Sequence, residues 1–84
     1  MTFSPSPIAV RFDDAQMWID LDDGRTLGIP LVWFPRPLRA TPQERQAFFL
    51  SPGGMHWEKI DEDISIAGLL AGRGDTTRNS RAAA

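Results

Sequence analysis

The chain has 84 residues, no cysteine and a formal net charge of −2. This length fits one domain, and a domain of this size buries only about 60% of the surface that its unfolded chain exposes. Without cysteine the chain can form neither a disulfide nor a thiolate metal site, and its hydrophobic content of 42% excludes a disordered protein.

Composition divides the chain into three parts. Residues 1–7 are polar and carry two Ser-Pro pairs, which predicts a flexible N-terminus. Residues 8–72 hold six basic and ten acidic side chains and form the single predicted domain. Residues 73–84 hold three arginines and one acid, which predicts a disordered basic tail. The chain shows no signal-peptide pattern and no apolar run near the ~20 residues that span a bilayer, so we expect a cytoplasmic protein.

The first part of the domain has three stretches in which apolar residues alternate with other residues, as in half-buried strands. The apolar positions of the three stretches are Ile8, Val10 and Phe12; Met17, Ile19 and Leu21; and Leu27 and Ile29. Residues 13–16 make the first reversal, and Asp22-Asp23-Gly24 predicts a tight second turn because glycine adopts positive φ at little cost. Pro30 ends the third strand since it has no N–H to donate. The pattern predicts an antiparallel β-meander.

The middle of the chain predicts a helical layer on this sheet. Residues 31–39 contain two prolines, Pro35 and Pro37, and predict a short, irregular or 3₁₀ helix. Thr41-Pro42-Gln43-Glu44 matches a capping box, in which Thr41 caps the helix and Glu44 reaches back to the cap. We therefore predict a helix over residues 42–49.

The end of the domain predicts one more strand and one more helix. A turn at residues 51–54 is followed by a short strand at residues 55–57. Ser65 is positioned to cap a helix over residues 66–71 that Gly72 closes. The predicted fold class is α+β: an antiparallel β-meander with a helical insertion, a further short strand and a short C-terminal helix.

Three side chains are candidates for contact with a partner. Trp18 is out of phase with the apolar residues of its strand, so it lies on the opposite face of the sheet, where a helix, a chain end, a partner or a second copy could cover it. Arg36 and Arg39 make the helical layer locally basic. They form either a solvated face paired with the acidic turns or a surface for an acidic partner.

His56, Asp61 and Asp63 bring an imidazole and two carboxylates within eight positions. Such groups could bind a metal ion or act as a general acid–base pair. The sequence lacks a second histidine and any metalloprotease or nucleophile-elbow motif, so a structural interpretation of these three residues is favoured over metal binding or catalysis. In that reading His56 packs beside Trp57, and the acidic run binds backbone amides or pairs with Arg36 or Arg39. No cofactor and no catalytic residue is predicted.

Several strings resemble a known family: Asp-Gly-Arg-Thr, Pro-Leu-Val-Trp-Phe-Pro-Arg, Ala-Thr-Pro-Gln-Glu-Arg and Met-His-Trp-Glu-Lys-Ile-Asp-Glu-Asp-Ile-Ser. Over residues 8–72 the chain resembles the small bacterial proteins catalogued as domain of unknown function 2442. The resemblance implies a small α+β domain. It also implies a regulatory or antitoxin-like partner, since many relatives are encoded beside another small protein. Some relatives add a helix-turn-helix domain, for which there is no room after Gly72.

Three functions follow as hypotheses. The first is a non-enzymatic protein-interaction module that binds another small protein or itself. The second is a metal-binding protein or enzyme that uses His56, Asp61 and Asp63. The third is a DNA-binding regulator, which the acidic domain disfavours because phosphate contacts need clustered lysine and arginine.

Overall fold

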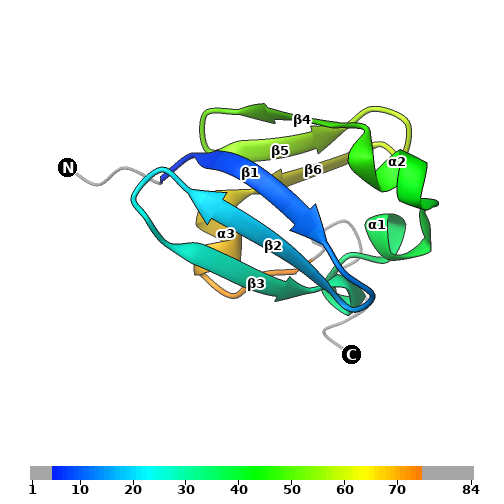
Figure 1. The fold of residues 1–84 in the computed structure, drawn as a ribbon, viewed down its shortest axis with the longest axis horizontal. Coiled ribbons are helices and arrows are strands. Elements are labelled where there is room, and N and C mark those ends of the chain that lie inside the picture. The colour runs from blue at the N-terminus through cyan, green and yellow to red at the C-terminus, as the bar shows by residue number, and fades with distance from the viewer. Residues whose placement is uncertain (1–4, 75–84) are drawn as a thin grey trace.

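Two three-stranded antiparallel sheets, packed face to face, form the body of the chain in a computed structural model that describes residues 5–74 (Figure 1). The first sheet contains β1 (Pro7–Phe12), β2 (Gln16–Leu21) and β3 (Thr26–Pro30), and the second contains β4 (Phe48–Ser51), β5 (Gly54–Trp57) and β6 (Glu62–Ser65). Short helices lie between the sheets in sequence: η1 (Leu31–Trp33), α1 (Pro35–Arg39) and α2 (Pro42–Gln46). The last helix, α3 (Ile66–Leu70), follows β6. This arrangement confirms the predicted α+β class.

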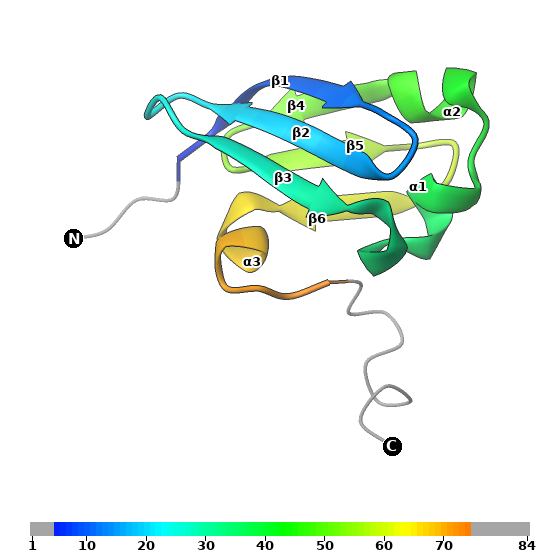
Figure 2. The same ribbon diagram turned by 60° about the horizontal axis from the view of Figure 1, so that its bottom comes forward.

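The two sheets meet along β1 and β4, where the rings of Phe12 and Phe48 pack with centroids 6.3 Å apart. On the opposite side, α3 follows β6 and lies below β3 and β6 in the view of Figure 2. The flexible N-terminus predicted for residues 1–7 and the tail predicted for residues 73–84 fall mostly outside the described residues, so both stay predictions.

The first sheet confirms the predicted meander. Met17, Ile19 and Leu21 of β2 are all buried, and Gly24 in the second turn has a φ of +94°. The expected position of Ile8 is wrong, because its side chain is 62% exposed. Pro7 pairs with Leu21 while Ala9 pairs with Asp20, so Ile8 is the extra residue of a β-bulge and turns away from the core.

The second sheet has three strands where the sequence predicts one. The predicted capping box is present, with the Thr41 hydroxyl accepting from the Glu44 amide at 3.1 Å. The helix over residues 42–49 is nevertheless too long, because α2 ends at Gln46 and Phe48 begins β4. The ring of Phe48 contacts Trp57 across the strand pair at a centroid distance of 6.0 Å. Cross-strand aromatic packing thus replaces the last helical turn.

The helix expected over residues 31–39 is divided into η1 and α1. Phe34 separates them in an extended conformation, with φ −133° and ψ 91°. The reason is the following residue, Pro35, because a proline ring disfavours helical geometry in the residue before it. The predicted C-terminal helix is confirmed in α3, where the Ser65 hydroxyl accepts from the Gly68 amide and Gly72 has a φ of +78°.

The core lies between the inner faces of the two sheets. Its buried apolar side chains come from both sheets, the middle segment and α3: Met17, Ile19, Leu21, Ile29, Leu31, Phe34, Met55, Trp57, Ile64, Ile66 and Leu69. Trp57 is the largest of these, with only 2% of its surface exposed. Its indole N–H donates to the Arg45 carbonyl at 2.9 Å, so the polar end of the ring is also satisfied.

Trp18 lies half-buried on the outer face of the first sheet. Its indole N–H donates to the Asp13 carboxylate at 2.8 Å, and its ring covers Gly28 of β3, where an added Cβ would lie 2.5 Å from the ring. This indole bond and the amides of Ala15 and Gln16 hold the pKa of Asp13 below its ordinary value. The neighbouring strand therefore covers part of Trp18. Contact of the remaining surface with a partner stays a prediction.

We predict that Trp57→Ala destabilises the domain by ~3–5 kcal/mol, because it leaves a large cavity in the core and an unpaired Arg45 carbonyl. Urea denaturation followed by circular dichroism measures the loss. Phe49→Ala is the control, since Phe49 belongs to the same sheet but is 51% exposed, and a smaller loss is expected. A loss below ~1 kcal/mol for Trp57→Ala would contradict this packing.

We also predict that Asp13→Asn weakens the acid dependence of stability. A carboxylate with a lowered folded-state pKa stabilises the fold above its unfolded-state pKa, and that contribution disappears as pH falls through the folded-state pKa. The difference in melting temperature between wild type and variant should therefore be largest near neutral pH and shrink below about pH 4. The variant still shows part of the acid dependence of stability, because the pKa values of Asp20 and Asp23 are also lowered. A difference that stays constant with pH would count against the Asp13–Trp18 bond.

Candidate functional site

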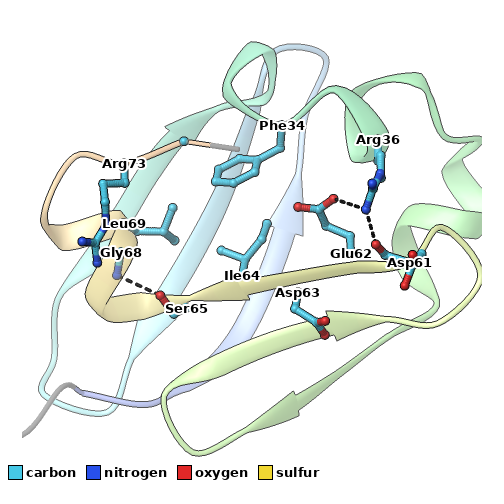
Figure 3. A pocket seen from close by; sticks show the side chains of 11 residues that line it. Phe34, Arg36, Asp61, Glu62, Asp63, Ile64, Ser65, Gly68, Leu69 and Arg73 are labelled. Carbon is cyan, nitrogen blue, oxygen red and sulfur yellow. Dashed lines mark hydrogen bonds and ion pairs between the residues drawn. The ribbon is translucent and has the colours of Figure 1, made fainter. Parts of the chain in front are cut away.

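A cavity of about 340 Å³ lies beside β6, between that strand, the start of α1 and the helix α3. Five consecutive residues, 61–65, line one side of it. Phe34 and Arg36 close it from the middle segment, and Gly68, Leu69 and Arg73 close it from the C-terminal side (Figure 3). Because consecutive residues of a strand point to opposite faces, a wall of five in a row means that the cavity borders the edge of the strand.

β6 is an edge strand, hydrogen-bonded to β5 and to no other described strand. The Ile66 amide donates to the Gly53 carbonyl at 2.9 Å, in register with the pairs of β5 and β6. Backbone groups of an antiparallel strand alternate in direction. Those of Glu62 and Ile64 therefore face β5, and the amides of Asp63 and Ser65 face the free edge. The Asp61 carbonyl, on the same edge, accepts from Arg36.

The inner part of the cavity is apolar. Figure 3 shows the side chains of Phe34, Ile64 and Leu69 directed toward one another from three different parts of the chain. Each is at most 5% exposed, so these side chains hold fixed positions in the core while parts of them reach the cavity. A ligand here would find an apolar wall next to a row of backbone donors and acceptors.

Each end of the cavity carries an arginine. Arg36 binds the Asp61 carbonyl and lies 3.5 Å from the carboxylate of Glu62, which is only 4% exposed. The side chain of Arg73 passes over Gly68 at the other end, where an added Cβ would lie 3.7 Å from its Nε. Within residues 5–74, no carboxylate lies close enough to Arg73 for an ion pair. The Arg73 guanidinium is therefore available to pair with an anionic group at this end, while Asp61, Glu62 and Asp63 line the strand side of the same cavity.

The predicted pairing of the acidic run with the middle segment is present between Arg36 and Glu62. Arg39 does not line this cavity, but it shares a second, shallower cavity with Arg36, Pro35, Ala40, Glu44 and Ile60. Trp18 is on the outer face of the other sheet. The three predicted partner contacts thus do not form one surface, and the cavity beside β6 includes only Arg36.

The structure brings His56 and Asp63 together but separates Asp61 from them. His56 and Asp63 face each other across β5 and β6, and Nδ1 of the imidazole lies 2.8 Å from Oδ1 of the carboxylate. Asp61 precedes β6 in a left-handed conformation, with a φ of 54°, and directs its carbonyl to Arg36. Among residues 5–74, no group of three His, Asp or Glu side chains is placed to hold a metal ion.

The third partner in the histidine cluster is Ser51, which the sequence does not single out. Its hydroxyl contacts Nε2 of His56. Ser51 pairs with Gly54 at the end of a hairpin, and Gly54 is two residues before His56 on the same strand. The side chains of Ser51 and His56 therefore lie on the same face of the sheet. The sequence contains one signal for this position, the Pro-Gly pair that is typical of a two-residue hairpin turn. Together with a strand at residues 48–51, this turn would have placed Ser51 beside His56.

None of the helices in the described part of the chain has the length or apolar character needed to cross a membrane. No curated protein matches the chain. Two solved structures are similar. One is a protein of unknown function from Rhodospirillum rubrum, at 30% identity and a TM-score of 0.73, covering 87% of this chain and 93% of that one. The other is an uncharacterised protein from Chromobacterium violaceum, at 23% identity and a TM-score of 0.75, covering 92% of this chain and 74% of that one.

The second of these similarities shows the fold alone. Residues 7–75 match the family model described as "Protein of unknown function (DUF2442)". This match spans nearly all of the two-sheet body, from β1 through α3. The chain therefore belongs to this family.

Proposed function

We propose that the chain is a protein-interaction module that binds an extended peptide segment of a partner protein along the free edge of β6. The observation that carries the proposal is the cavity beside this edge, into which the outward amides of Asp63 and Ser65 open. An exposed strand edge is a template for a further strand, and peptide recognition by strand addition uses this property. The apolar wall and the arginines then select the peptide.

The side chains around the cavity support a peptide of particular composition. Side chains of an added strand alternate between the two faces of the sheet. On one face an apolar side chain would meet Phe34, Ile64 and Leu69, which line the cavity. An acidic side chain or a terminal carboxylate would meet Arg73 at the end of the cavity. A volume of about 340 Å³ is at the lower end of the range for ligand sites and suits one or two side chains.

The resemblance described above supports a regulatory or antitoxin-like role for this binding. Family members are often encoded beside another small protein, and that neighbour is the partner we propose. We place the interaction in the cytoplasm, in keeping with a chain that has no cysteine.

The proposal predicts that Asp63→Pro weakens peptide binding without unfolding the domain. The Asp63 amide faces away from β5, so proline removes no ladder hydrogen bond but places its ring on the free edge. Random 12-residue peptides displayed on phage are selected on the wild-type protein, and the affinity of an enriched peptide is measured by fluorescence polarisation. We expect affinity to fall at least about tenfold, equivalent to 1.4 kcal/mol.

Asp63→Ala is the matched control, because it removes the same carboxylate but keeps the amide. Its affinity for the peptide should stay within about threefold of wild type. If Asp63→Pro is folded by circular dichroism and still binds as tightly as wild type, the peptide does not use this edge. If no peptide is enriched over selection on the heat-unfolded protein, the proposed function itself is contradicted.

A second prediction concerns the charge of the bound peptide. Arg73→Glu reverses the charge at one end of the cavity and should weaken binding of the enriched acidic peptide at least about fivefold, more strongly at low salt. Arg39→Glu is the control, because it makes the same change in net charge at an exposed position outside this cavity. Equal losses for the two variants would mean that Arg73 acts only through net charge.

A further inference from the structure

Ser51, His56 and Asp63 form a polar cluster on the outer face of the second sheet, one residue from each of β4, β5 and β6. The Ser51 hydroxyl contacts Nε2 of His56, and Nδ1 of the same ring lies 2.8 Å from Oδ1 of Asp63. The order of atoms is hydroxyl, Nε2, Nδ1 and carboxylate. This is the connectivity of a serine–histidine–aspartate triad, which is recognised by geometry and not by position in the sequence.

The sheet holds the three groups in place. His56 pairs directly with Asp63 across β5 and β6, and Ser51 lies diagonally across β4 and β5. The ring of Phe49 stacks on the imidazole at a centroid distance of 5.0 Å and an interplanar angle of 28°, which limits rotation of the imidazole. Gly54 leaves space beside the hydrogen bond between Ser51 and His56, since a Cβ added to this glycine would lie 3.3 Å from both His56 Nε2 and Ser51 Oγ.

We propose that Ser51 is an activated nucleophile that accepts acyl groups from small aromatic esters. In this assignment His56 is the general base that takes the hydroxyl proton, and Asp63 is a positioning residue that fixes the tautomer and orientation of the imidazole. The exposed half of the Phe49 ring, 51% exposed and adjacent to the cluster, provides the apolar contact for an aromatic ester.

The reaction has two steps. In the first, the Oγ–acyl bond forms and the bond between acyl carbon and ester oxygen breaks, while the Ser51 proton passes through Nε2 of His56 to the departing alcohol. In the second, water attacks the acyl carbon and gives its proton to His56, the Oγ–acyl bond breaks, and the proton returns to Ser51. The products are the alcohol and the carboxylic acid, and no further reactant is needed.

The test uses an alkyl fluorophosphonate as the probe. Attack by Ser51 forms a P–O bond and breaks the P–F bond, and fluoride leaves together with the hydroxyl proton. Peptide mapping by mass spectrometry should locate the adduct on Ser51. Ser65 is an internal control in the same protein, because its hydroxyl accepts from the Gly68 amide and has no imidazole beside it. We expect labelling of Ser51 to be about 100-fold faster than labelling of Ser65, the scale of a general-base effect.

Variants separate the roles of the three residues. Ser51→Ala should give no adduct, and His56→Gln should slow labelling of Ser51 about 100-fold. Asp63→Asn should lower kcat for p-nitrophenyl acetate with little change in KM, and the folded fraction of the variant is measured so that a loss of active protein is not counted as a loss of kcat. Melting temperatures within a few degrees of wild type establish that each variant is folded. The proposal is wrong if Ser51 is labelled no faster than Ser65, or if folded His56→Gln is labelled as fast as wild type.

Discussion

Among residues 5–74, the backbone of β6 pairs with another strand on one side only, and this unpaired edge determines where a ligand could bind. The two sheets approach each other along β1 and β4, where Phe12 and Phe48 meet, and they do not join along β3 and β6. Helix α3 and the middle segment occupy that open side, and they leave a cavity beside the strand. An unpaired strand edge can pair with another chain and cause aggregation, so proteins cover such an edge or use it to bind a partner. Here the cover is partial, and the uncovered part carries the proposed binding site.

The ion pair between Arg36 and Glu62 connects the helical layer to this edge. Glu62 occupies an inward position of β6 and is only 4% exposed, so its carboxylate loses most of its hydration on folding. Such a charge is tolerated when a counter-charge and hydrogen bonds compensate for the lost water. Arg36 supplies the charge and also binds the Asp61 carbonyl. The same side chain therefore fixes α1 against β6 and forms one end of the cavity.

Much of the fold could be predicted from local patterns, because those patterns act over a few residues. The alternation in residues 17–21, the capping box at Thr41 and the cap at Ser65 all lie within single elements, and the structure contains each of them. The predictions fail where distant residues decide. Residues 47–49 continue a helical pattern, yet Phe48 leaves the helix to pack on Phe12 and Trp57. Ile8 fits the alternation but falls at a bulge that pairing with β2 imposes.

The candidate site was harder to predict, for two physical reasons. Residues 62–65 alternate buried and exposed as a strand should, but Glu62 stands where an apolar residue is expected, so the strand pattern is hidden. The sequence pattern correctly grouped His56 with Asp63, and these two residues are neighbours across β5 and β6. It also included Asp61, which the turn before β6 directs elsewhere, and it missed Ser51, which reaches the imidazole only through the pairing of β4 and β5.

Amide hydrogen exchange of β6, measured residue by residue by NMR, shows whether one edge of this strand is unpaired. We expect an alternating pattern, in which the amides of Glu62 and Ile64 exchange at least about 100-fold more slowly than those of Asp63 and Ser65. A saturating concentration of the selected peptide should then protect Asp63 and Ser65 as well. Equal protection of all four amides in the protein alone would mean that the edge of β6 is already paired and cannot accept a further strand.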